Sequence, residues 1–133
     1  MRALRVLIIE DETFIALLLA EVLAEMGHEV CASEQTETGA VAAAARYHPE
    51  LIIADVRLCE GSGINAVRAI LSAGFVPHIF VSGDVLDQKL LHPAACVLQK
   101  PFQETQLVRA IERAIEPANV FIGKKYIEDR REP

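Results

Sequence analysis

Five short apolar runs alternate with longer helical segments along this 133-residue chain, and this alternation restricts the fold more than any other feature. Three of the runs are nearly continuous in Val, Ile, Leu and Phe, as expected for parallel strands that are covered on both faces. Glycine or proline ends the helical patterns that lie between them. The expected strands are Leu4–Ile9, Val30–Ala32, Leu51–Ala54, His78–Val81 and Cys96–Leu98, and the expected helices are about Glu12–Met26, Thr36–Tyr47, Gly63–Ala73 and Glu104–Ile115.

This order of elements predicts an α/β domain whose five-stranded parallel sheet is doubly wound, with helices on both faces. Such a sheet is flavodoxin-like, with strand order 2-1-3-4-5. The fourth unit departs from the pattern, because only Val85–Leu91 could be helical before His92 and Pro93 end it. We therefore expect a short or irregular fourth helix.

Composition and charge exclude several classes of protein. Hydrophobic residues make up 52% and charged residues 24%, which is typical of one globular domain and not of a disordered chain. The net charge of −6 argues against a nucleic-acid surface, which needs clustered Lys and Arg. The apolar stretch Phe14–Ala24 is too short to span a bilayer, so no membrane association is expected.

Three cysteines, Cys31, Cys59 and Cys96, are odd in number and have no metal-site spacing. With no signal peptide visible, they predict a reduced protein of the cytoplasm.

Residues 1–116 form the expected domain, and residues 117–133 form a partly apolar tail without a separate output domain. Apolar side chains in the tail predict that it packs on its own domain or on a partner. They are Val120, Phe121, Ile122, Tyr126 and Ile127.

Polar side chains follow four of the five predicted strands, at the edge where open parallel sheets bind ligands. They are Glu10 and Asp11 after the first strand, Asp55 after the third, Ser82 after the fourth and Lys100, followed by Pro101, after the fifth. Each alone is explained as a helix-terminal, turn or surface residue. All of them at one edge predict a site.

The chemistry of these side chains points to phosphoryl transfer. Three carboxylates repel one another, and Mg²⁺ with its preference for oxygen ligands would resolve that repulsion. Asp55 could then attack phosphorus and form an acyl phosphate. Phosphoryl transfer needs positioning and positive charge, which Lys100 supplies, while Ser82 donates a hydrogen bond to the phosphoryl group.

With these residues the chain resembles the bacterial response-regulator receiver family through to about Ile115. The matching segments are Val6–Glu12, Leu51–Leu58 with Asp55, Gly63, Phe80–Gly83 and Lys100–Phe102. The resemblance implies that Asp55 accepts a phosphoryl group from a sensor histidine kinase or a histidine phosphotransfer protein. Such a domain is no enzyme beyond its own phosphorylation and dephosphorylation.

The resemblance also implies roles for the other residues. Asp11, Asp55 and the backbone carbonyl of Arg57 would ligate Mg²⁺, and Glu10 would act directly or through water. Ser82 and Lys100 would contact the phosphoryl group. In the family the peptide bond before Pro101 is often cis.

Three positions depart from the family pattern. Cys59 replaces a frequent proline, the segment between Ser82 and Lys100 is short, and Val97 replaces the usual Tyr or Phe. The run Pro77–Gly83 with the missing aromatic is similar to an atypical group of single-domain receivers, the "FAT GUY" type. Output would then come from ordering of the segment 83–92.

Partners and alternatives stay open at this stage. Seven apolar residues of the first helix are too many for one buried stripe: Phe14, Ile15, Leu17, Leu18, Leu19, Val22 and Leu23. Either some are exposed for a partner, or the core and the tail cover them. An unknown downstream protein and a homodimer are both compatible with this surface. The alternative function is a pseudo-receiver that binds partners without phosphorylation.

Enzyme functions are disfavoured. An aspartyl phosphatase usually needs an acid two residues after its nucleophile, where Arg57 stands here. An oxidoreductase that binds a dinucleotide needs a glycine-rich turn where Glu10, Asp11 and Glu12 stand.

Overall fold

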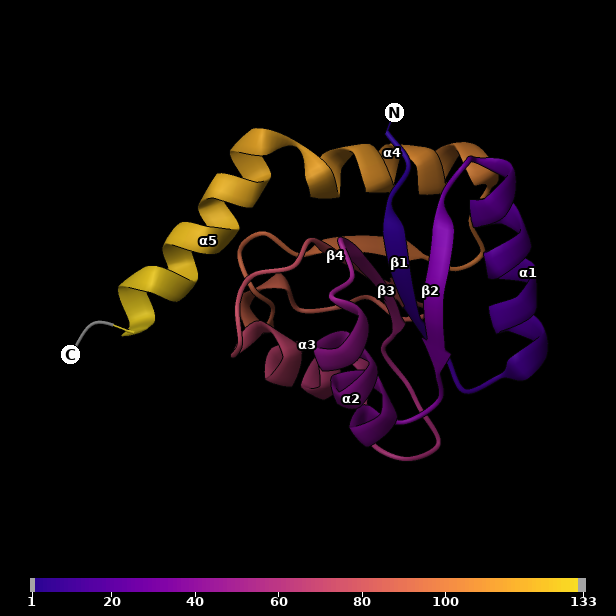
Figure 1. The fold of residues 1–133 in the computed structure, drawn as a ribbon, viewed down its shortest axis with the longest axis horizontal. Coiled ribbons are helices and arrows are strands. Elements are labelled where there is room, and N and C mark those ends of the chain that lie inside the picture. The colour runs from indigo at the N-terminus through magenta and orange to yellow at the C-terminus, as the bar shows by residue number, and fades with distance from the viewer. Residues whose placement is uncertain (1, 132–133) are drawn as a thin grey trace.

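The computed structural model describes residues 2–131 and confirms the predicted α/β architecture (Figure 1). Five strands form one parallel sheet in the order β2-β1-β3-β4-β5. The strands are β1 Arg5–Ile9, β2 Glu29–Glu34, β3 Leu51–Asp55, β4 His78–Ser82 and β5 Cys96–Gln99. The helices are α1 Thr13–Glu25, α2 Glu37–Tyr47, α3 Gly63–Leu71, α4 Glu104–Ile115 and α5 Pro117–Arg131, and η1 is a 3-10 turn at Gln88–Leu90.

Helices cover both faces of the sheet because alternate strand residues point to opposite faces. Val6 and Ile8 of β1 lie in a cluster with α1 and α4, whereas Leu7 and Ile9 lie in a cluster with α2 and α3. Figure 1 shows these two helix pairs on either side of the strands. Burial on both faces explains why the strands are apolar runs and not alternating patterns.

The crossover between β4 and β5 contains only the single turn η1, so the predicted short fourth helix is confirmed. The side chain of Asp87 accepts a hydrogen bond from the backbone N–H of Lys89 and begins this turn. Leu91 and Ala94 then enter the core. The chain therefore connects two neighbouring strands without the helix that normally covers this part of the sheet.

The sequence analysis did not predict that the segment from Pro117 is helical. The Asn119 side chain of α5 donates hydrogen bonds to the carbonyl oxygens of Ala94 and Ala114, at 3.1 and 3.2 Å. Gly123 packs so closely on Phe75 that a Cβ there would lie 2.3 Å from the ring. Figure 1 shows α5 leaving the domain on the side opposite α1.

Because α5 lies at the far side, it does not cover the apolar surface of α1. Phe14 is 70% exposed and Leu17 61% exposed, and Ile15 and Leu18 are also exposed. Within residues 2–131, no helix combines the length and the hydropathy needed to cross a membrane. The exposed apolar residues of α1 form a surface patch.

Gly63 begins α3 directly against the end of β3. Its N–H donates to the carbonyl oxygen of Val56 at 3.0 Å, and a Cβ on it would lie 2.0 Å from the carbonyl oxygen of Asp55. That oxygen belongs to the backbone, so it can move only if the strand end moves. Only glycine allows α3 to begin this close to Asp55.

Replacing Gly63 with Ala is therefore expected to lower the free energy of unfolding by about 1–3 kcal/mol, the usual cost of forcing atoms into a packed site. Urea unfolding followed by circular dichroism measures this change. Gly83→Ala is the matched control, since a Cβ at Gly83 meets nothing within 4 Å. Equal losses of stability in the two variants would contradict the steric explanation.

His78 is a buried histidine at the start of β4, only 1% exposed. Its Nδ1 lies 2.8 Å from the carbonyl oxygen of Val76, and the rings of Phe75 and Phe80 pack against it. Burial lowers the pKa of His78 from its ordinary value of 6.5 to about 4, although the bond to Val76 opposes this. The folded protein therefore keeps this imidazole neutral.

His78 makes the stability of the fold depend on pH. As pH falls from 6.5 toward 4, the unfolded chain binds a proton that the folded protein refuses, so stability is lost across this range. The loss attributable to His78 is about 3 kcal/mol, from about 1.4 kcal/mol per pH unit. Urea unfolding at several pH values should show a shallower slope for His78→Asn. His48→Asn, at an exposed helix end, is the matched histidine control.

Candidate functional site

The carboxyl edge of the sheet holds a cavity of about 460 Å³ that the residues after β1, β3, β4 and β5 line. Asp11, Asp55, Arg57, Ser82 and Lys100 all lie on its wall. These residues are far apart in sequence, and only the parallel sheet brings them together.

Asp55 ends β3 and lies at the centre of the site. Its Oδ2 forms an ion pair with Nζ of Lys100 at 2.7 Å, and its Oδ1 accepts a hydrogen bond from the backbone N–H of Arg57 at 3.1 Å. The Asp55 side chain is only 12% exposed and that of Lys100 is 38% exposed, so water reaches the pair mainly from the lysine side. Burial opposes the charge of Lys100, but the bond to Asp55 and its negative charge outweigh this and raise the pKa of the ammonium.

The backbone aims Lys100 into the cavity. Its N–H donates to the carbonyl oxygen of Ser82 at 2.8 Å, which extends the pairing of β5 with β4 to the edge of the sheet. The peptide bond between Lys100 and Pro101 is cis. The lysine is thus held by the sheet and not by a free loop.

Asp11 is held by the loop after β3. Its Oδ2 accepts a hydrogen bond from the backbone N–H of Cys59 at 2.7 Å. Hydrogen bonds from the thiol and the backbone of Cys59 lower the pKa of Asp11, so it is a carboxylate near neutral pH. The Asp11 carboxylate in turn raises the pKa of the Cys59 thiol, which therefore stays protonated near neutral pH.

Glu10 differs from the other two acids. It is 5% exposed and lines the adjacent cavity beside α1 and α4, together with Asp55 and Lys100. Its Oε2 accepts a hydrogen bond from the N–H of Glu12 at 3.1 Å. Burial raises the pKa of Glu10 to about 7; the Glu12 N–H opposes this, and Asp55 raises the pKa further. Glu10 is therefore partly protonated near neutral pH, because its burial and the nearby Asp55 carboxylate both disfavour its negative charge.

Ser82 and Arg57 both engage Asp84, a residue that the sequence analysis did not single out. The Ser82 hydroxyl donates to the carbonyl oxygen of Asp84 and accepts from its N–H, each at 3.0 Å. The Arg57 guanidinium forms a 2.6 Å ion pair with the Asp84 carboxylate. The sequence does show that Asp84 follows Ser82 by two residues. It does not show that the side chain of Arg57 reaches Asp84.

The oxygen atoms at this edge of the sheet fit a hard divalent cation that keeps some of its water ligands. Asp11 and Asp55 supply carboxylate oxygens and Arg57 a backbone carbonyl, which are ligands that Mg²⁺ accepts alongside water. Within residues 2–131, no three acidic, histidine or cysteine side chains form a group arranged to hold a metal ion. A cation would therefore bind through two side chains, a carbonyl and water, and not in a cage of three carboxylates.

Comparison with known proteins gives the family. Residues 6–112 match the model of the response regulator receiver domain, which is most of the chain. The chain belongs to the response regulator receiver family. This match includes Asp11, Asp55, Ser82 and Lys100, so the residues around the cavity all lie inside the receiver domain.

Relatives of the receiver include regulators of different kinds. It is 36% identical over 115 residues to the transcriptional regulatory protein PdtaR of Mycobacterium tuberculosis, covering 84% of this chain and 56% of PdtaR. It is 36% identical over 118 residues to the phyllosphere-induced regulator PhyR of Methylorubrum extorquens, covering 85% of this chain and 44% of PhyR. The chain thus spans about half the length of these curated relatives.

A solved structure agrees with the fold of the receiver. The solution NMR structure of the PhyR receiver domain of Erythrobacter litoralis superposes with a TM-score of 0.76 at 35% identity. The superposition covers 85% of this chain and 90% of that domain. The strand order and the helix layers are therefore those of receiver domains.

Val97 occupies the position in β5 where the sequence analysis noted that the family usually has Tyr or Phe. Val97 of β5 is half-buried and pairs in register with Phe80 of β4. No aromatic ring can therefore move with Ser82 from this place. The Asp84 contacts lie on the segment that continues into η1.

Proposed function

We propose that this receiver accepts a phosphoryl group on Asp55 from a phosphohistidine donor, with Mg²⁺ bound, and signals by changing its binding to a partner protein. The observation that supports this most directly is the 2.7 Å pair of Asp55 and Lys100 beside Asp11 and Ser82 in one cavity. A nucleophile, a cation and a hydrogen-bond donor are then within reach of the same phosphoryl group.

In the proposed step, a carboxylate oxygen of Asp55 attacks phosphorus, and a P–O bond forms as the P–N bond to the donor histidine breaks. The imidazole nitrogen leaves with the electron pair of that bond. Lys100 already lies beside Asp55, so its ammonium can turn from the carboxylate to a phosphoryl oxygen. The Ser82 hydroxyl can likewise leave the backbone of Asp84 to donate to the phosphoryl group.

Mg²⁺ would supply positive charge against the phosphoryl oxygens when bound to Asp11, Asp55 and the Arg57 carbonyl. Asp11 is a suitable ligand because its pKa is lowered and it carries a charge. Glu10 would act behind these ligands, since it lines the adjacent cavity.

The exposed apolar surface of α1 is the proposed docking surface for the donor, a histidine kinase or a phosphotransfer protein. It lies beside the opening of the cavity that Glu10, Asp55 and Lys100 line. A helix docked there would bring a histidine close to Asp55. The cytoplasm, where such donors act, is the proposed location.

Asp55→Asn is expected to abolish incorporation of phosphate from acetyl phosphate or a phosphorylated donor domain, because an amide is a poor nucleophile toward phosphorus. Acrylamide gels that retard phosphorylated protein, or intact-mass spectrometry, measure the incorporation. Asp87→Asn is the control, since this exposed acid begins η1 and does not line the cavity. Equal labelling of Asp55→Asn and native protein would show that the acceptor is another residue.

A pseudo-receiver that binds partners without phosphorylation is the second candidate, and one observation favours it. Lys100 and the Arg57 N–H already satisfy both oxygens of Asp55. Asp55 can therefore keep its charge without a bound cation.

Beryllofluoride separates the two candidates, because it mimics a phosphoryl group on an aspartate. For a phosphorylatable receiver we expect beryllofluoride with Mg²⁺ to produce chemical-shift changes in ¹⁵N correlation spectra that neither Mg²⁺ nor beryllofluoride produces alone. The changes should include Ser82, Gly83 and Asp84, whose hydroxyl and backbone contacts have to rearrange. A spectrum that Mg²⁺ and beryllofluoride leave unchanged would favour the pseudo-receiver.

A further inference from the structure

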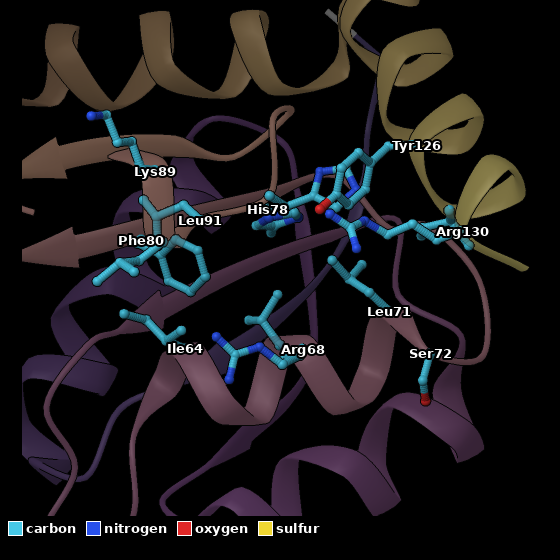
Figure 2. A pocket seen from close by; sticks show the side chains of 14 residues that line it. Ile64, Arg68, Leu71, Ser72, His78, Phe80, Lys89, Leu91, Tyr126 and Arg130 are labelled. Carbon is cyan, nitrogen blue, oxygen red and sulfur yellow. The ribbon is translucent and has the colours of Figure 1, made fainter. Parts of the chain in front are cut away.

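A second cavity, of about 550 Å³, lies away from Asp55 between α3, β4, the η1 segment and α5. Its size falls in the range of about 300–1,000 Å³ that is typical of small-molecule sites. Apolar side chains make up much of its wall, among them Ile64, Leu71, Phe80, Leu91 and Ile127. Figure 2 shows side chains of α3, β4, the η1 segment and α5 around this cavity.

The cavity is positively charged although the chain carries a net charge of −6. Arg68, Lys89 and Arg130 line it, and no Asp or Glu does. Across the described part of the chain, neither arginine forms an ion pair with a carboxylate. Arg68 donates to the Asn65 side chain, and Arg130 lies over the ring of Tyr126 at 4.4 Å. Both guanidinium groups therefore keep donors available for an anion.

His78 supplies a further and independent sign of a ligand. Its Nδ1–H donates to the carbonyl oxygen of Val76, which leaves Nε2 with a lone pair. That buried Nε2 atom has no hydrogen-bond partner among residues 2–131. Figure 2 shows the His78 ring beside Phe80, with the Arg130 side chain extending toward it, and the His92 ring packs against both His78 and Tyr126. An unsatisfied buried acceptor is costly, and a ligand donor would remove that cost.

We propose that this cavity binds a small aromatic anion. The apolar wall and the ring of Tyr126 would contact its flat body, and Arg68 and Arg130 would pair with its acidic group. An N–H or O–H group would donate to Nε2 of His78 after the rings that enclose this atom move aside. This site is distinct from the Asp55 site, because the two cavities share no residue.

The absence of a regular fourth helix explains why there is room for such a ligand. The η1 segment contributes Lys89, Leu90 and Leu91 to the wall, and α5 contributes Tyr126, Ile127 and Arg130. The tail helix thus closes a space that a longer β4–β5 crossover would fill. Removing α5 would remove one of the two arginines and the aromatic ring.

The full chain is tested by titration with 8-anilino-1-naphthalenesulfonate, a fluorescent aromatic anion that carries an N–H group. We expect saturable binding to one site, and weaker binding of the neutral analogue N-phenyl-1-naphthylamine. Arg68→Gln and Arg130→Gln should each weaken the Kd of the anion by about tenfold, as expected when a charged hydrogen bond is lost. Arg109→Gln, on exposed α4 outside this cavity, is the control and should bind as the native protein does.

Two further measurements show whether each variant is folded and where the dye binds. Urea unfolding confirms that each variant unfolds cooperatively, because loosely folded protein also binds this dye. Chemical-shift changes on dye binding should concentrate at Leu91, His92 and Tyr126. Changes at Leu18 and Phe102 instead would place the dye in the groove beside α1 and overturn the proposal. Equal affinities of Arg130→Gln, Arg68→Gln and Arg109→Gln would also overturn it.

Discussion

The ion pair between Asp55 and Lys100 is the interaction on which the edge of this sheet depends. Two strands that are not neighbours, β3 and β5, end in opposite charges 2.7 Å apart, with β4 between them. Glu10, Asp11 and Asp55 would otherwise place three acids around one small region with no compensating cation. Lys100 offsets the charge of Asp55, and in the proposed function the same ammonium would turn to a phosphoryl group.

The sequence predicted the sheet well because burial on both faces leaves an unambiguous signal. The helix predicted at Glu104–Ile115 has those bounds in the structure, and the predicted strand order is confirmed. The position of the acidic, hydroxyl and lysine residues at one edge followed from the topology of a parallel sheet. Their placement required no knowledge of side-chain contacts.

Contacts between side chains could not be predicted in the same way. Nothing in the spacing of Arg57 and Asp84 shows that they pair, because the pairing depends on how the loop after β4 turns. Glu10 shares one cavity with Asp55 and Lys100, beside α1 and α4, while Asp11 lines the cavity on the other side of Asp55. The helix α5 did have a signal, because Pro117 occupies the first helical position, where proline is favoured. The mixed charges of the tail obscured it.

Strand β4 connects the two cavities, because residues at its two ends line one cavity each. His78 begins the strand and lines one cavity, while Ser82 ends it and lines the other. The segment after Ser82 carries Asp84, which Ser82 and Arg57 hold, and then Lys89 and Leu91, which line the second cavity. This segment is therefore the stretch of chain that joins the walls of the two cavities. If release of Asp84 shifts the segment, a ligand bound beyond it must change the affinity of the first site by the same factor in return, because binding linkage is reciprocal.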